Sequence, residues 1–245
     1  MRRLFVPPGQ LAAAREGVLS LTAEQARYLG LVLRLRDGDL VEVFDGRGTR
    51  LAARLSPLGG ELALRLGEPA RDEEATGSIV LAQALSKGEK LDWVVQKATE
   101  LGVSRIVPFA AERSVVKLSA ERGAARVERL RRIAQEAARQ CGRGDVPQVD
   151  APAPWDDLLA LPDQDPALRA VLLDADPGLP PLGQLDAGPR VLLVVGPEGG
   201  FSPGERQGAA AAGFVAASLG RRVLRTETAG LAAIAVVQHL RGELG

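Results

Sequence analysis

Apolar and polar side chains alternate in short runs through residues 1–71, and turns containing Gly or Pro separate these runs. Such runs are typical of short strands, because successive side chains of a strand point to opposite faces of the sheet. The pattern predicts strands over residues 3–6, 40–44, 49–55 and 61–66. One helix, predicted over residues 26–35, interrupts them, with Thr22 as its N-cap and Gln25 three residues later. This region therefore predicts a small β-rich domain of the barrel type.

The apolar pattern changes its period after residues 67–77, a charged segment that contains Pro and two Gly. We place a domain boundary there, between a first domain of residues 1–71 and a second of residues 72–245. In the second domain, strand-like runs alternate with runs of helical spacing. The predicted strands are residues 78–85, 105–109, 170–174, 191–195 and 214–218, and the predicted helices are residues 91–101, 121–141, 204–212 and 227–240. The Pro-rich residues 147–166 are predicted to form a loop with one short helix.

This alternation predicts an α/β domain with a largely parallel sheet. By pattern alone the domain is doubly wound and Rossmann-like, and its ligands lie beyond the carboxyl ends of the strands. Three strand ends carry loops that suit such a role, and together they make a stronger case for a site than any one alone.

The first of these loops is GPEGG, residues 196–200, which ends an apolar run before Ser202 begins a helix as its N-cap. Glycine lets backbone N–H and C=O groups approach a ligand, because no Cβ is in the way. The loop is neither GxGxxG nor GxxxxGK[ST], so the dinucleotide and P-loop arguments do not apply. A tight strand-to-helix turn without any ligand explains the pattern equally well.

The other two loops also connect a strand to a helix. LGRRVLRTET, residues 219–228, offers three arginines to a phosphate, while Thr226 and Glu227 suit a helix start, where hydroxyls cap and carboxylates meet the positive end of the dipole. QALSKGEKLDW, residues 83–93, is basic and contains Gly. The alternative for this last loop is a solvated connection with Trp93 as a core aromatic.

Composition excludes several classes of protein. Apolar residues make up 46% of the 245 and charged residues 25%, as in ordinary globular proteins. The chain has one cysteine, Cys141, and one histidine, His239, so an intrachain disulfide and a Cys/His metal cluster are excluded, and we expect no metal. We expect Cys141 to pack on the apolar side of its helix. The N-terminal MRRLFVPPGQ lacks the apolar stretch of a signal peptide, and no apolar run reaches the length of a membrane span. We therefore expect a cytoplasmic protein that does not associate with a membrane.

The charge of the chain sums to zero but is unevenly spread. Residues 1–71 hold 11 basic and 8 acidic side chains, residues 112–143 hold 9 and 4, and residues 144–189 hold 1 and 9. At the angular spacing of a helix, six arginines fall on one arc of the predicted helix 121–141 and its end. They are Arg122, Arg126, Arg129, Arg132, Arg139 and Arg143. Such a face is most often simply solvated, but beside a basic domain it is a candidate track for RNA phosphates.

Four segments carry a family resemblance: VGPEGGFSPGE, LGRRVLRTETA, SKGEKLDWVVQKATELGV and EAARQCGR. They resemble the signature blocks of the ribosomal RNA small subunit methyltransferase E family, of the SPOUT class of S-adenosylmethionine-dependent RNA methyltransferases, in that family's order and over nearly the whole chain. The resemblance implies an N-terminal PUA-like β-barrel and a C-terminal α/β domain with a trefoil knot, in place of a Rossmann-like one. It also implies a homodimer that methylates N3 of a specific uridine in small-subunit (16S) ribosomal RNA.

Carried over block by block, the resemblance implies that ten residues bind S-adenosylmethionine: Gly196, Pro197, Glu198, Gly199, Leu219, Gly220, Val223, Leu224, Thr226 and Thr228. Uracil N3 is mostly protonated at neutral pH, so the enzyme must stabilise the anion or remove the proton. Arg225 is the first candidate, because its guanidinium can hold a uracil oxygen or a flanking phosphate as negative charge develops. Glu198 is the second, as a proton acceptor, although holding its own loop is an equally good role.

The candidate RNA contacts are the cations of the first domain, the third loop and the arginine-faced helix: Arg2, Arg3, Arg34, Lys87, Lys90, Arg122, Arg126 and Arg129. Tyr28 stands where the family tends to have histidine. An aromatic there can stack on an RNA base, but a half-buried aromatic on the helix is the more common role. Two rival functions remain open at this point. One is a non-catalytic RNA-binding or ribosome-assembly factor on the same fold, and the other is a Rossmann-type enzyme acting on a small molecule.

Overall fold

The computed structural model describes residues 2–58, 60–71, 77–114, 120–186 and 188–245, and the chain divides into two compact units. Unit 1 comprises Met1–Glu74 and Ala138–Val146, and unit 2 comprises Ala75–Ala137 and Pro147–Gly245. Each unit has its own sheet and its own apolar core. No helix among the described residues is long and apolar enough to cross a membrane.

Unit 1 is built on a five-stranded sheet with the strand order β1-β3-β4-β5-β2. The strands are β1 (Arg3–Phe5), β2 (Val18–Ser20), β3 (Leu40–Phe44), β4 (Thr49–Leu58) and β5 (Glu61–Arg71). β1 pairs with β3 in parallel, and the other pairs are antiparallel. The four predicted strands are present, whereas the short β2 was not predicted. Among the described residues, the pairings run from β1 to β2 without closing the sheet.

Strand β5 continues five residues beyond its predicted end at Leu66. Its register with β4 shifts between Leu51 and Ala53, so that the strand passes through Gly67 at an irregularity. A Cβ at Gly67 would lie 2.9 Å from the carbonyl O of Ala52, and only glycine allows this close approach of the two backbones. The glycine that indicated a strand end in the sequence is therefore a bulge inside a longer strand. The rest of the predicted boundary, residues 72–76, lies outside the described residues.

The predicted helix 26–35 is wrong in its extent. The chain forms α1 (Pro8–Ala12), α2 (Ala23–Arg27) and then one turn of π-helix, η1 (Tyr28–Val32). Thr22 caps α2 in a capping box with Gln25, as the sequence predicted. The wider turn brings both Leu29 and Leu35 into the core of unit 1, so burial overrides the regular helical spacing.

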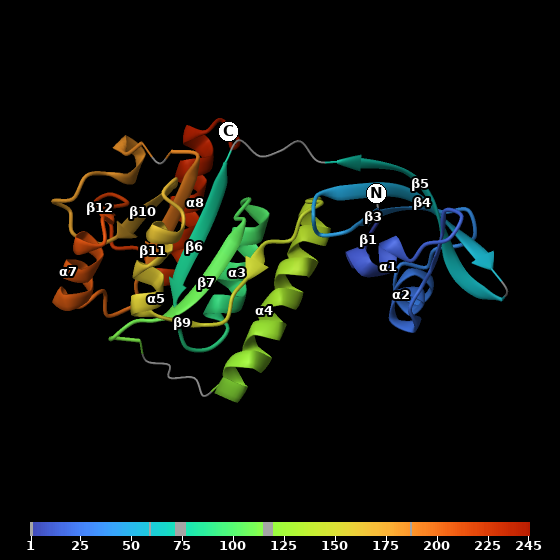
Figure 1. Ribbon diagram of the computed structural model, residues 1–245, viewed down its shortest axis with the longest axis horizontal. Helices are drawn as coiled ribbons and strands as arrows, with labels where there is room; N and C mark the ends of the chain where they lie inside the picture. The colour runs from blue at the N-terminus through green and yellow to red at the C-terminus, as the bar shows by residue number, and fades with distance from the viewer. Residues whose placement is uncertain (1, 59, 72–76, 115–119, 187) are drawn as a thin grey trace. The chain divides into compact units, whose positions relative to one another are not determined.

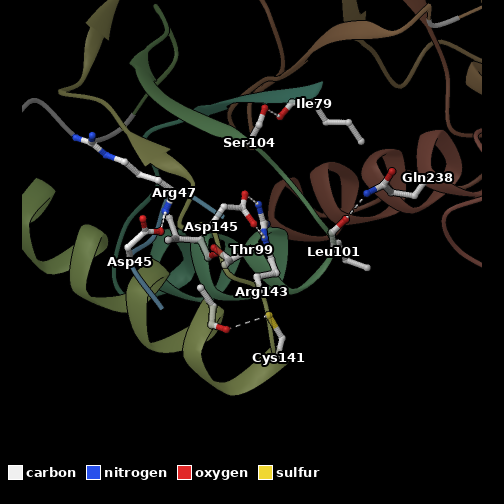
Figure 2. Close-up of polar contacts among 12 residues, drawn as sticks. Asp45, Arg47, Ile79, Thr99, Leu101, Ser104, Cys141, Arg143, Asp145 and Gln238 are labelled. Atoms are coloured by element: carbon white, nitrogen blue, oxygen red, sulfur yellow. Dashed lines mark hydrogen bonds and ion pairs between the residues drawn. The ribbon is translucent and has the colours of Figure 1, made fainter. Parts of the chain in front are cut away.

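Hydrogen bonds connect the second segment of unit 1, Ala138–Val146, to the first. Arg3 is buried, and its guanidinium donates to Glu42 Oε1 at 2.5 Å and to the carbonyl O of Ala138 at 3.0 Å. Arg143 pairs with Asp145 at 2.6 Å (Figure 2). Cys141 is exposed, so the prediction that it packs in a core is wrong.

Unit 2 contains a sheet of seven strands, all paired in parallel, which confirms the α/β class (Figure 1). Its main order is β12-β10-β11-β6-β7-β8, and β9 pairs with β7. The strands are β6 (Ser78–Ala84), β7 (Arg105–Ala110), β8 (Gln148–Val149), β9 (Ala153–Pro154), β10 (Leu168–Leu173), β11 (Arg190–Val195) and β12 (Val215–Ala217). The predicted loop 147–166 holds β8, β9 and two short helices rather than one, α5 (Trp155–Leu159) and α6 (Leu161–Gln164).

Helices cover both faces of this sheet. They are α3 (Lys90–Glu100), α4 (Ala120–Cys141), α7 (Pro203–Ala211) and α8 (Thr226–Leu240), with a short 3-10 turn η2 (Leu182–Gln184). Alternate strand residues such as Val80 and Ala82 pack in one core with residues of α5 and α7. Leu81 and Val195 face the other way, where a Cβ at Gly230 of α8 would lie 3.2 Å and 3.5 Å from their side chains.

Helices α3 and α8 pack against each other on that second face. Gln238 of α8 donates from Nε2 to the carbonyl O of Leu101 at 2.9 Å, just after α3 ends (Figure 2). Trp93 of α3 is 45% exposed, so the alternative of a core aromatic is wrong. Leu91, Val94, Val95 and Ala98 supply the buried stripe of α3 instead.

Candidate functional site

A cavity of about 440 Å³ opens at the carboxyl ends of β10, β11 and β12 in unit 2. Its lining comes from the residues after β10, the loop between β11 and α7, and the segment between β12 and α8. The volume lies within the range of small-molecule sites, roughly 300–1,000 Å³. The cavity is thus at the edge of the sheet where the sequence predicted ligands to bind.

Buried hydrogen bonds connect two of these segments to β6. Thr226, the first residue of α8, donates from Oγ1 to the carbonyl O of Gly196 at 2.7 Å. Gln83 of β6 donates from Nε2 to the same hydroxyl at 2.9 Å. The Thr226 hydroxyl therefore joins β6, the loop after β11 and α8. It does not cap the helix, because Arg225 occupies the N-cap position.

The loop after β11 is shaped by its own packing. A Cβ at Gly196 would lie 2.9 Å from the ring of Phe201, which explains why the position needs glycine. Ser202 caps α7, as predicted, and forms a capping box with Glu205. The carboxylate of Glu205 also accepts a bond from the backbone N–H of Glu112 at 2.8 Å. These contacts fix the loop before any ligand arrives.

A cluster of charges lies at the cavity. The Lys90 ammonium is 2.7 Å from Glu198 Oε1 and 3.4 Å from Glu227 Oε2, and Arg225 lies 4.0 Å from the other Glu227 oxygen. The hydrogen bond from Lys90 lowers the pKa of the Glu198 carboxyl below its ordinary value. The same bond raises the pKa of Lys90. Glu198 is therefore ionised at neutral pH and is a weaker base than an isolated glutamate.

The third wall of the cavity includes two residues that the sequence did not single out. Asp174 follows β10 directly, and its carboxylate pairs with Arg206 of α7 at 2.6 Å. The signal was available, because Asp174 is a polar residue at the carboxyl end of a buried strand, where ligands of α/β sheets bind. Arg206 gave no such signal, since it lies on an exposed position of a helix.

Nine of the ten predicted cofactor-binding residues line this cavity: Gly196, Pro197, Glu198, Gly199, Leu219, Gly220, Val223, Leu224 and Thr226. Thr228 does not, because it lies exposed in the first turn of α8. Arg225, the first candidate for catalysis, also lines the cavity, and its side chain is 83% exposed.

The predicted RNA-contacting residues of unit 1 differ in their exposure to solvent. Arg2 and Arg34 are exposed, and Arg34 adopts a left-handed backbone conformation with φ of 54°. Arg3 is buried in the bonds described above and lies over the Phe44 ring, so it is not on the surface that an RNA would meet. Tyr28 is half-buried against the guanidinium of Arg139.

The predicted contacts of unit 2 are mostly engaged within the unit. Arg126 donates to the carbonyl O of Ser86 at 3.1 Å, and Arg129 pairs with Asp92 and with Glu89. Lys90 belongs to the charge cluster at the cavity, whereas Lys87 is exposed. The side chain of Arg122 lies outside the described residues.

The chain is similar in sequence to known RNA methyltransferases. A family model described as an RNA methyltransferase domain matches residues 72–238, and one described as an RNA methyltransferase PUA domain matches residues 21–64. The chain belongs to the ribosomal RNA small subunit methyltransferase E family. It is 31% identical to the family member of Bacillus subtilis, over 99% of this chain and 100% of that one. It is 35% identical to that of Synechocystis, over 97% and 77%.

A solved structure of the same family extends this likeness to three dimensions. The enzyme from Neisseria gonorrhoeae, crystallised with S-adenosyl methionine, is 33% identical to this chain and superposes with a TM-score of 0.86 over 98% of each chain. The family thus has a PUA domain at its N-terminus and an α/β methyltransferase domain after it, as the four sequence blocks predicted.

Proposed function

We propose that this protein transfers a methyl group from S-adenosylmethionine to N3 of a specific uridine in small-subunit (16S) ribosomal RNA. The observation that carries the proposal is the cavity at the ends of β10, β11 and β12. Nine residues that the family resemblance selected from two separate sequence blocks line this one cavity. Their convergence is what a cofactor site in this family requires.

The donor set of the cavity fits S-adenosylmethionine. Leu219, Val223 and Leu224 offer apolar contact to an adenine, and the glycines at 196 and 220 expose backbone groups for its polar edges. The carboxylates of Asp174 and Glu198 suit the positive charges of the ligand, and Arg206 and Arg222 suit its carboxylate. When bound, the sulfonium supplies an electrophilic methyl group, so the chain needs to provide only position and charge.

We assign the main catalytic role to Arg225. Its guanidinium is exposed at the cavity, where it can hold a uracil oxygen or a flanking phosphate as N3 loses its proton to solvent water. Glu198 suits the task of proton acceptor less well, because its ion pair with Lys90 lowers the pKa of the carboxyl. We therefore give Glu198 the role of fixing its loop.

The two matched regions receive separate tasks in this proposal. Residues 1–71 form a PUA-like domain that binds the RNA, and residues 72–245 form a SPOUT domain whose C-terminal segment passes through a trefoil knot. In support of the knot, β12 pairs at the sheet edge next to β10, whereas the following helix α8 packs against β6, β11 and α3. The active form is a cytoplasmic homodimer that acts on ribosomal RNA within the small subunit.

The proposal is tested by incubating the purified chain with small-subunit RNA from cells lacking this modification and with S-adenosylmethionine labelled in its methyl group. We expect label in one nucleoside, which mass spectrometry identifies as N3-methyluridine. If the chain bound the RNA, did not bind the cofactor and transferred no labelled methyl group, it would instead be the non-catalytic assembly factor.

A further inference from the structure

Lys90 lies between two carboxylates that are distant from it in the sequence. It is the first residue of α3, Glu198 belongs to the loop after β11, and Glu227 is the second residue of α8. The Lys90 Nζ atom is 2.7 Å from Glu198 Oε1 and 3.4 Å from Glu227 Oε2. One cation therefore bridges three strand-to-helix connections of unit 2.

We propose that Lys90 is a positioning residue, which holds the Glu198 loop and the start of α8 in the arrangement that binds the cofactor, and that it is not an RNA contact. This inference rests on the proposed function, because it assigns the cavity to S-adenosylmethionine. It departs from the sequence interpretation, in which Lys90 was one of several basic residues available to RNA.

The burial of Glu227 shows why this cation is needed. The Glu227 side chain is 15% exposed, and its Oε2 atom has no hydrogen-bond partner among the described residues. A carboxylate withdrawn from water is unfavourable unless a cation compensates it. Of the two cations that pair with Glu227 among the described residues, Lys90 is the nearer, because Arg225 is 4.0 Å away and extends into solvent. Without Lys90, Glu227 and Glu198 would repel each other across the same gap.

A neutral connection joins the same three segments. The hydroxyl of Thr226 binds both Gln83 of β6 and Gly196 of the loop, so β6, the loop and α8 are already in hydrogen-bond contact. Lys90 adds a charged connection close to that chain, at the start of the helix that follows β6. Both Gly196 and Glu198 line the cavity, so a loop released by the loss of Lys90 would alter the cavity wall itself.

The test compares Lys90→Met with Lys97→Met, a matched control. Lys97 lies on the same helix with almost the same exposure, 37% against 36%, but it pairs with Glu100, outside the cavity lining. Isothermal titration with S-adenosylmethionine measures cofactor affinity, and filter binding of deproteinised small-subunit RNA without cofactor measures RNA affinity. We expect K90M to weaken cofactor binding about three- to tenfold and K97M to leave it unchanged. RNA affinity should stay within twofold for both variants.

The pH dependence of cofactor binding gives a second readout. The groups that face Glu198 are Lys90, which makes the hydrogen bond, and Lys87, which adds attraction. In K90M the pKa of Glu198 returns toward its ordinary value, so the loss of affinity on acidification should begin at a higher pH than in the wild type. Lys90→Arg keeps a cation at this position and should restore most of the affinity.

Distinct results separate the possible failures. Wild-type protein that bound no S-adenosylmethionine would overturn the proposed function, and this inference with it. Wild-type binding together with unchanged cofactor affinity in K90M, or an RNA affinity that fell in K90M alone, would overturn the inference only. If K90M failed to fold by circular dichroism, Glu198→Gln would remove the same ion pair from the other side, and unchanged cofactor affinity there would overturn it equally.

Discussion

The hydroxyl of Thr226 donates a 2.7 Å hydrogen bond to the carbonyl oxygen of Gly196, thirty positions earlier in the chain. The bond joins the start of α8 to the loop after β11, at the point where both line the cavity. Thr226 is buried, and the same hydroxyl accepts a bond from Gln83, so it donates and accepts within the protein. Thr226 therefore ties two walls of the cavity together.

We expect Thr226→Val to lower the free energy of unfolding by about 1–3 kcal/mol, since the Gly196 carbonyl and the Gln83 amide both lose a buried partner. Cofactor affinity should fall with it. Thr99→Val is the matched control, because Thr99 is also buried but donates to the carbonyl O of Val95 within α3, away from the cavity. Chemical denaturation and cofactor titration measure the two effects. Equal cofactor affinities in the two variants would contradict this account.

Much of the fold could be predicted because local patterns agree with the tertiary structure. The alternation in Leu40–Phe44 and the helical spacing of Lys90–Glu100 predicted both elements to within one residue, and Thr22 and Ser202 marked helix starts through capping boxes. The resemblance of the GPEGG and LGRRVLRTET blocks selected most of the cavity lining. Each of these patterns is local, because it depends on residues that lie close together in the sequence.

The features that could not be predicted depend on contacts across the sequence. Gly67 indicated a strand end but forms a bulge, because its partner Ala52 lies in another strand. Asp174 and Arg206 join the cavity only through the pairing of β10 with its neighbours. The basic character of Lys90 indicated RNA, whereas its two carboxylate partners are more than 100 positions away.

The pKa shifts of Lys90 and Glu198 set the pH range over which their ion pair exists. The pKa of Glu198 is lowered, so its charge is present above the ordinary value of about 4.3 and is lost only as pH falls through the lowered value. The pKa of Lys90 is raised, so its charge is lost only as pH rises through a value above about 10.4. The pair is thus intact between about pH 6 and 9.

It follows that Glu198 does not titrate across that range, and that any rise of the methylation rate with pH comes from the ionisation of uridine N3. We expect Glu198→Gln to lower the rate but to keep the wild-type slope of rate against pH, measured under single-turnover conditions with saturating cofactor. A wild-type rate that stayed flat across this range, with a pH slope that appeared only in the variant, would show that Glu198 is the base after all.

The exposed arginines near the cavity make a prediction for RNA binding. Arg221 and Arg222 are exposed and have no polar partner in the described part of the chain, whereas Arg126 and Arg129 are engaged within unit 2. We expect the double change of Arg221 and Arg222 to Ala to reduce the slope of log affinity against log salt by about 1.4, at about 0.7 for each lost phosphate contact. The same change at Arg126 and Arg129 should leave that slope nearly unchanged. The reverse result would favour a phosphate track along α4.

For Arg225 we expect a loss of rate without a loss of binding. Arg225→Ala should lower the single-turnover rate about 100- to 1,000-fold, as when one donor to a developing negative charge is removed, while cofactor affinity changes less than about threefold. Arg190→Ala serves as the control, because Arg190 lies at the other end of β11 in an ion pair with Asp165. Methylation of RNA at the wild-type rate by R225A would remove Arg225 from the mechanism.

The central claim is that the cavity at the ends of β10, β11 and β12 supports methylation of one uridine at N3. It is tested most directly by nucleoside mass spectrometry of small-subunit ribosomal RNA from cells that lack the gene, cells in which it is restored, and cells that carry the R225A variant. The account predicts one N3-methyluridine that is missing in the deletion, returns with the wild-type gene and stays missing or much reduced with the variant. An unchanged level of N3-methyluridine in the deletion, or its full return with R225A, would contradict it.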